Sequence, residues 1–203
     1  MKWAGLWFLT FLAAGCGSAG PSTGSADGTP KKPGSAASAG VGLAIVSFDE
    51  IQERIARHRG KVVVMDAWST SCPPCIAEFH HLVELHRQYG PERLACMSLS
   101  FDYEGVGKPE EQVAGVIKFL QSQGAAFENL MSNEESDVLY RKFKLAAVPA
   151  VFVYDRAGQL RKRFDNEQAN SKAEAFTYEQ VGQLVAELLE EPAAAASNEP
   201  GAP

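Results

Sequence analysis

Two cysteines separated by two prolines stand between a predicted buried strand and a predicted helix, and this junction restricts the fold more than any other part of the chain. Residues 61–68 contain the continuous apolar run VVVM, which is typical of a strand covered on both faces. Residues 72–75 read Cys-Pro-Pro-Cys, and residues 74–89 then carry apolar side chains at helical spacing. Cysteines three apart in the first turn of a helix lie on the same side, close to disulfide geometry. The junction therefore predicts a disulfide that opens and closes with little movement of the backbone.

Outside this junction, predicted strands and helices alternate along the chain. The strands are expected at residues 43–47, 61–68, 94–101, 126–130, 150–154 and 159–164. The helices are expected at residues 49–58, 74–89, 110–123, 136–143 and 178–189. Because only the turn 155–158 separates the last two strands, they are expected to form a hairpin. The pattern predicts an α/β sandwich with a mixed central sheet flanked by helices.

The composition excludes several classes of protein. The chain has 203 residues and is 45% hydrophobic, which is enough for one ordinary domain with a real core. Its 19 Lys and Arg and 25 Asp and Glu give a net charge of -6, which argues against nucleic acid as a partner because phosphate binding needs clustered basic residues. No apolar run approaches the roughly 20 residues of a membrane-spanning helix.

The two ends of the chain differ in composition from its middle. Residues 1–15 combine Lys2, a short apolar stretch and small residues, as an export signal does. Their ending, LAAG before Cys16, resembles the lipobox of bacterial lipoproteins, which implies a lipid on Cys16; a plain secretory signal is the alternative. Residues 16–42 are expected to form a lipidated start and a flexible Gly/Ser/Ala/Pro linker. The domain is expected at residues 43–190, followed by a disordered tail at residues 191–203.

The cysteine pair has two other possible roles on the residues alone. A zinc site would need two more ligands, and the nearby His80, His81 and His86 lack the spacing of a Cys-x-x-Cys…His-x-x-x-His site. A structural disulfide can occur in an exported protein. A disulfide that closes a four-residue loop stabilises the fold little, however, because this stabilisation grows with loop length. We predict no metal, and no cofactor beyond the redox-active disulfide itself.

Two segments resemble a known family. Residues 64–79, VMDAWSTSCPPCIAEF, look like the active-site strand, turn and helix of thioredoxin-like proteins, closest to the membrane-anchored TlpA/ResA type. Residues 147–158, AVPAVFVYDRAG, look like the segment that carries the cis-proline and the following hairpin in that family. The resemblance implies a thioredoxin-like fold, with an extra βα insertion before the cis-proline strand.

The resemblance also implies roles for three residues. Cys72 matches the cysteine that attacks a substrate disulfide, and Cys75 matches the cysteine that resolves the mixed disulfide. Pro149 matches the cis-proline beside the pair, whose preceding backbone is left free to bind an extended substrate. An ordinary trans proline at the start of a strand is the alternative for Pro149.

Two acidic residues are further candidates for the catalytic site. Asp66 shares a strand face with Val62 and Val64, so burial should raise the pKa of its carboxyl and suit it to take the proton of Cys75. It matches the buried acid of thioredoxin, although a structural strand-end Asp is also possible. Glu78 matches a glutamate near the active site of ResA-like members, and a solvated carboxylate in the first turn of a helix is equally consistent with the sequence.

Residues around the pair are candidates for substrate binding. These are Trp68, Pro73, Pro74 and Val148. Ser71 departs from the family, which usually places Trp directly before the first cysteine. Cys96 alternates with Leu94 in a predicted buried strand, so we expect it to be a core residue rather than a third redox thiol.

The sequence thus predicts an exported thiol–disulfide oxidoreductase, lipid-anchored to a bacterial membrane and facing the periplasm or the cell exterior. The resemblance favours a reductase of disulfides in exported proteins, in cytochrome c maturation or in disulfide correction. Its reductant would be a membrane thiol-electron transporter, because thiols are not kept reduced outside the cytoplasm. An oxidant or isomerase stays open, as do a copper-chaperone-like or redox-inactive binding protein of the same fold.

Overall fold

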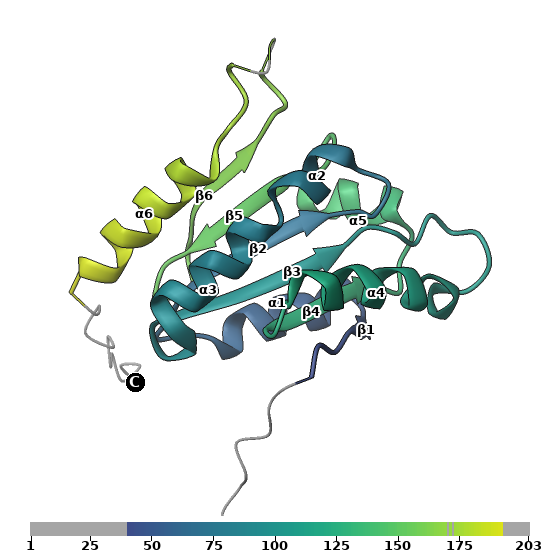
Figure 1. Cartoon of the computed structure of the whole chain (residues 1–203), viewed down its shortest axis with the longest axis horizontal. Helices are drawn as coiled ribbons and strands as arrows, with labels where there is room; N and C mark the ends of the chain where they lie inside the picture. Colours follow the sequence, from purple (N-terminus) through teal and green to yellow (C-terminus); the bar gives the residue numbers. More distant parts are fainter. Residues whose placement is uncertain (1–39, 170, 172, 193–203) are drawn as a thin grey trace, which may run out of the picture. The chain divides into compact units, whose positions relative to one another are not determined.

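One mixed β-sheet organises the molecule (Figure 1). The computed structural model describes residues 40–169, 171 and 173–192. Six strands lie in the order β1-β4-β3-β2-β5-β6. Their bounds are β1 (Ala44–Val46), β2 (Val62–Trp68), β3 (Leu94–Ser100), β4 (Glu128–Ser132), β5 (Ala150–Tyr154) and β6 (Leu160–Asp165). The helices are α1 (Phe48–Arg57), α2 (Pro73–Glu78), α3 (His80–Arg93), α4 (Val113–Gln123), α5 (Ser136–Phe143) and α6 (Tyr178–Glu190), with a 3₁₀ turn η1 (Pro109–Gln112).

The strand that leads to the cysteine pair lies inside the sheet. β2 pairs with β3 in parallel along its whole length, from Val62 opposite Leu94 to Trp68 opposite Ser100. On its other side β2 pairs with β5 in the antiparallel direction, and β6 closes the hairpin. Every residue of β2 is buried, as its apolar composition predicts. The loop that leads to Cys72 therefore begins at the end of a buried strand that the sheet holds in place.

Helices cover both faces of the sheet. One face of β2, with Val63 and Met65, packs against α1 and α5. The other face, with Val62 and Val64, packs against α3 and α6, and α4 packs around Trp68 farther along. Figure 1 shows α3, α4 and α6 on the near side of the sheet. The predicted α/β sandwich with a mixed sheet is confirmed.

The predicted insertion before the cis-proline strand is also present. Between β3 and β5 the chain forms α4, β4 and α5. β4 lies between β1 and β3 and is parallel to both. The inserted strand thus widens the sheet on the side away from the hairpin.

Three elements differ from the sequence prediction. The helix expected at residues 74–89 is divided into α2 and α3 at Phe79, and the Leu82 N–H bonds the Phe79 carbonyl three residues back. The helix expected at residues 110–123 begins with η1, so regular α-helix starts only at Val113. β4 starts two residues late because the Ala125 N–H bonds the Leu120 carbonyl in α4 and the Ala126 N–H bonds the carbonyl of Gly124, the residue that ends the helix.

The predicted export signal, Cys16, nearly all of the linker and the tail beyond residue 192 lie outside the described residues. Within the described part of the chain, no helix has both the length and the apolar character needed to cross a membrane.

Candidate active site

Cys72 and Cys75 form a disulfide at the carboxyl end of β2, with their Cα atoms 5.3 Å apart. Cys72 is the residue that caps α2, and Pro73 and Pro74 occupy the first two helical positions without N–H groups. The first available donor is therefore the Cys75 N–H, which donates to Cys72 Sγ over 3.2 Å. This bond would stabilise a thiolate at Cys72 once the disulfide opens.

The two sulfur-bearing residues differ in exposure. Cys72 is partly exposed and borders an open cavity, whereas Cys75 is 2% exposed and packs in the cluster that contains Trp68 and Phe79. An incoming molecule can consequently reach Cys72 but not Cys75. This asymmetry suits an attacking and a resolving cysteine, the roles that the resemblance implies.

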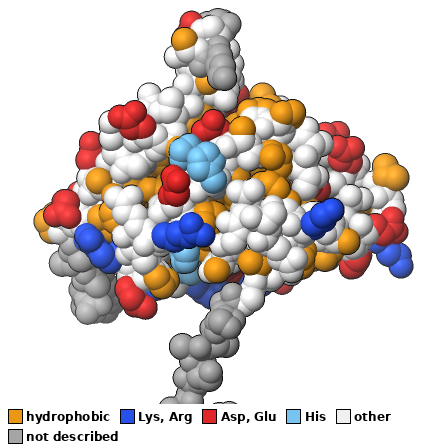
Figure 2. Space-filling view, in the orientation of Figure 1, with side chains coloured by type: hydrophobic (Ala, Val, Ile, Leu, Met, Phe, Trp, Pro, Cys, Tyr) orange, Lys and Arg blue, Asp and Glu red, His pale blue; other side chains and the backbone are white. Residues whose placement is uncertain are grey.

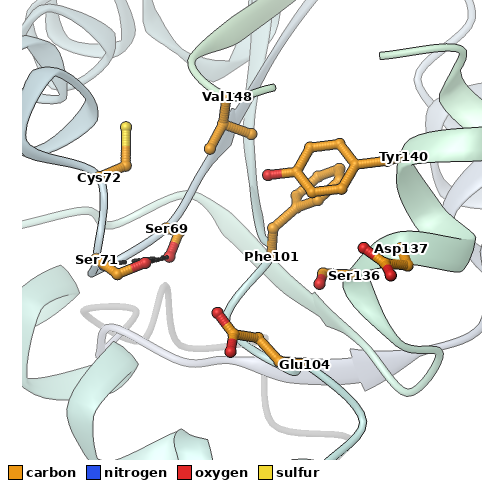
Figure 3. Close-up of a pocket in the computed structure, with 9 residues that line it drawn as sticks. All are labelled: Ser69, Ser71, Cys72, Phe101, Glu104, Ser136, Asp137, Tyr140 and Val148. Carbon is orange, nitrogen blue, oxygen red and sulfur yellow. Dashed lines mark hydrogen bonds between the residues drawn. The ribbon is translucent and has the colours of Figure 1, made fainter. Parts of the chain in front are cut away.

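The Val148–Pro149 peptide bond is cis, so the predicted geometry at Pro149 is confirmed. Val148 lines the same cavity as Cys72. The Tyr140 hydroxyl is hydrogen-bonded to the backbone of Val148. Figure 3 shows the Tyr140 hydroxyl directed toward Val148, across the cavity from Cys72. The residue before the proline and the accessible cysteine therefore face a common space.

Asp66 is buried in the centre of β2, between Ser98 of β3 and Val151 of β5. Its Oδ2 accepts a 2.5 Å hydrogen bond from the Tyr178 hydroxyl, and its Oδ1 has no hydrogen-bond partner among the described residues. Burial raises the pKa of Asp66 to about 7, against the smaller lowering effect of the Tyr178 hydrogen bond. The carboxyl is thus poised to exchange a proton near neutral pH.

Tyr178 is held in place by the start of α6. Thr177 and Gln180 form a capping box, in which the Thr177 hydroxyl accepts from the Gln180 N–H and the Gln180 side chain accepts from the Thr177 N–H. The helix then begins at Tyr178, whose side chain is buried against the sheet. Burial and the charge of Asp66 raise the pKa of Tyr178 well above its ordinary value, so the phenol stays a donor.

A carboxylate fixes the loop between β2 and Cys72. Asp102, two residues after β3, accepts hydrogen bonds from the Ser69 hydroxyl (3.1 Å), the Thr70 N–H (2.9 Å) and the Thr70 hydroxyl. Its other oxygen accepts from the Ser100 hydroxyl over 2.5 Å. Ser71, the departure from the family pattern, donates its N–H to the Ser69 hydroxyl. Hydrogen bonds to one carboxylate therefore position the approach to Cys72.

Glu78 lies exposed on the surface rather than in the cavity at Cys72. Its carboxylate is 3.4 Å from Nε2 of His81, whose Nδ1 is 3.1 Å from Glu84. The rings of His80 and His81 stack with centroids 3.9 Å apart, and Figure 2 shows histidine side chains gathered on the face that α3 covers. His80, His81 and Glu84 offer ligand atoms within 4.8 Å of one another, so a metal ion would find donors there.

The comparison with known families agrees with this geometry. Residues 41–179 match the Redoxin family. The chain belongs to the Redoxin family. Its fold is thioredoxin-like.

Relatives of this redoxin include proteins named thiol-disulfide oxidoreductase ResA. The protein from Geobacillus thermodenitrificans is 25% identical over 111 residues, which cover 55% of this chain and 58% of the relative. The one from Bacillus anthracis is 23% identical over 118 residues, covering 58% of this chain and 62% of the relative. The chain thus spans about three fifths of the length of the curated relatives it matches.

Solved structures share the fold of this redoxin. A thiol-disulfide isomerase from Corynebacterium glutamicum aligns with a TM-score of 0.52 and 23% identity, over 68% of this chain and 86% of that one. A secreted disulfide oxidoreductase from Mycobacterium tuberculosis aligns with a TM-score of 0.50 and 20% identity, over 66% of this chain and 86% of that one. At these identities the likeness describes the fold alone.

The remaining predicted residues of this redoxin lie in different places. Pro73 and Pro74 are exposed beside Cys72, where a substrate could touch them. Trp68, predicted to bind substrate, is fully buried and packs on Phe79 and Phe119, with ring centroids 5.0 and 4.8 Å away. Its side chain has no exposed surface for a substrate. It packs instead in the buried cluster that contains Cys75. Trp68 is covered because Phe119, on the inserted helix α4, packs against that face of β2.

Cys96 is a free, buried cysteine of β3, as its alternation with Leu94 predicts. Burial raises the pKa of the Cys96 thiol, which keeps it protonated and unreactive. Several residues of the site were not singled out from the sequence, among them Tyr140, Asp102 and Tyr178. For Tyr178 a signal existed, since Thr177 and Gln180 form a recognisable capping pair directly around it.

Proposed function

We propose that this protein is a thiol–disulfide oxidoreductase that uses the Cys72–Cys75 pair. The observation that carries the proposal is a disulfide with one accessible and one buried cysteine, beside a cis Val148–Pro149 bond in a Redoxin fold. The ResA relatives, which carry the name thiol-disulfide oxidoreductase, support the same activity.

The reaction follows from the positions of the two sulfurs. In the reduced protein, the Cys72 thiolate attacks one sulfur of a substrate disulfide, which breaks the substrate S–S bond and releases the other sulfur as a thiolate that takes up a proton. Cys75 then loses its proton and attacks Cys72 Sγ. This second step re-forms the Cys72–Cys75 disulfide and releases the first substrate cysteine as a thiol. Two electrons pass from the protein to the substrate in each cycle.

Asp66 is the proposed acceptor of the Cys75 proton. Its pKa of about 7 leaves the carboxyl partly ionised at neutral pH, and its Oδ1 is free of other described partners. We propose that the proton passes from Cys75 to this carboxyl directly or through one water. Tyr178 acts as a positioning residue, because its hydroxyl occupies Oδ2 and leaves Oδ1 for the exchange.

We propose that the protein works outside the cytoplasm as a reductase. The proposed anchor is a lipid on Cys16, and the proposed substrates are disulfides of exported proteins, in cytochrome c maturation or in disulfide correction. A membrane dithiol protein would return two electrons to the Cys72–Cys75 disulfide after each cycle. The support for this location and direction is the sequence resemblance.

Trapping with Cys75→Ser tests the proposal. Without the resolving thiol, Cys72 should stay joined to its substrate, so non-reducing gels of the full-length protein should show higher bands that dithiothreitol removes. The Cys72→Ser variant is the matched control and should show none. Equal banding in both variants, or none in either together with no reduction of insulin, would instead favour a redox-inactive binding protein. Stoichiometric Cu(I) bound by both thiols would favour the copper-chaperone alternative.

A further inference from the structure

A cavity of about 380 Å³ opens directly beside Cys72. Its walls come from the loop before α2, the loop after β3, the start of α5 and the residue before the cis-proline (Figure 3). A group in this space would be held within reach of the sulfur that attacks a substrate. The volume of the cavity suits one long side chain of a substrate, not a whole peptide.

The walls of the cavity carry negative charge and no positive charge. Glu104 and Asp137 are the charged residues of the lining, and no Lys, Arg or His is among the nine residues that form it. Neither carboxylate forms an ion pair with another residue in the described part of the chain. The remaining polar groups are hydroxyls, contributed by Ser69, Ser71, Ser136 and Tyr140.

The two carboxylates both affect the hydroxyl of Tyr140. Burial raises the pKa of Tyr140, and the charges of Asp137, Glu104 and Asp102 add to this effect; its hydroxyl is hydrogen-bonded to the Val148 backbone. Asp137 is in the first turn of α5, where the helix itself favours a carboxylate. Glu104 lies in a loop, where no helix start stabilises its carboxylate. Glu104 is therefore the residue that best distinguishes a binding role from a structural one.

We propose that this cavity receives a Lys or Arg side chain of the substrate protein, next to the cysteine that Cys72 attacks. The inference rests on the proposed function and narrows its substrates to disulfides in a basic sequence context. Glu104 and Asp137 pair with the cation, while the hydroxyls around them accept its remaining N–H groups. The stem of the side chain packs on Phe101 and Val148, the apolar part of the lining.

Paired peptides test the inference on the full-length protein. Two disulfide-linked peptides of one sequence should carry either Lys or Glu beside the reactive cysteine, and kcat/KM should be measured for each. We expect about a fivefold to tenfold preference for Lys, which is the effect of one or two charge pairs at exposed carboxylates. The preference should shrink in 0.5 M salt because ions screen exposed charges.

Matched variants test whether the carboxylate of Glu104 causes the preference for Lys. Glu104→Gln should reduce the preference to less than about twofold, whereas Glu187→Gln, which removes the same charge from an exposed site on α6, should leave it intact. Equal kcat/KM for both peptides, or an equal loss of preference in both variants, would overturn the inference.

A binding measurement separates this inference from the proposed function. Analogues with Ser in place of the reactive cysteine can bind to the oxidised protein but cannot react, so fluorescence anisotropy reports the charge preference alone. Preferential binding of the Lys analogue without turnover of either disulfide peptide would overturn the proposed function and support the site. Turnover without any charge preference in binding would do the reverse.

Discussion

The Tyr178 hydroxyl donates a 2.5 Å hydrogen bond to Asp66 Oδ2, across 112 positions of the chain. The bond joins the first residue of α6 to the middle of the strand that leads to Cys72. It holds one oxygen of a buried carboxyl whose pKa is about 7. The stability and the reactivity of the protein should therefore both depend on these two side chains.

Asp66→Asn should change how stability depends on pH. Burial raises the folded pKa of Asp66 from an ordinary 3.8 to about 7, so the native state holds its proton where the unfolded chain has lost it. The wild type should therefore lose stability relative to the variant as pH rises from 4 to 8, by about 4 kcal/mol at most. Urea unfolding of both proteins at several pH values measures this change, and a constant difference between them would contradict it.

Tyr178→Phe should move the pH profile of the reaction. The phenol lowers the pKa of Asp66, so its removal should raise that pKa above about 7 and shift the rise in rate to higher pH. Tyr154→Phe is the control, because Tyr154 is equally buried but belongs to the cluster on the other face of the sheet. Single-turnover rates from pH 5 to 9 measure the shift. A uniform loss of rate with an unmoved midpoint would show that the hydroxyl is only structural.

Asp102→Asn should loosen the loop that carries Cys72. An amide can replace only part of the acceptor capacity that Ser69, Thr70 and Ser100 use, so we expect a loss of about 1–3 kcal/mol in unfolding free energy. The rate of Cys72 alkylation in the reduced protein should change as well. Glu92→Gln, an exposed site, should alter neither quantity. Unchanged stability would mean that the loop holds its shape without the carboxylate.

Cys96→Ala should leave the reaction intact. The thiol is buried in β3 and its pKa is raised, so it has no means of exchange with a substrate. The variant should keep its insulin-reduction rate within about twofold and lose about 1 kcal/mol of stability from the lost methylene-sized volume. A large loss of rate at full stability would reveal a third redox thiol.

Local features of the site were predictable from the sequence. The Cys72–Cys75 disulfide depends on two residues three apart at a helix start, and strand alternation correctly places Asp66 on the face of Val62 and Val64. The cis bond at Pro149 was expected from family resemblance and not from any local pattern.

Contacts between distant elements were not predictable. The neighbours of Asp66 and Trp68 come from α6 and α4, and nothing near residues 66–68 specifies which helix will cover them. The division of the helix at Phe79 was not predicted either, because no Gly or Pro marks this position and the backbone of Phe79 remains helical. Hydrogen bonds that converge on Asp102 depend on the pairing of β2 with β3, which a single sequence does not fix.

The difference in exposure between the two cysteines has a consequence for kinetics. A thiol that returns electrons to the disulfide has to attack at Cys72, the position that a substrate also needs, because Cys75 is covered. Electron donor and substrate consequently compete for one docking surface and never occupy it together. The catalytic cycle should then obey double-displacement kinetics, in which an excess of either partner slows the half-reaction of the other.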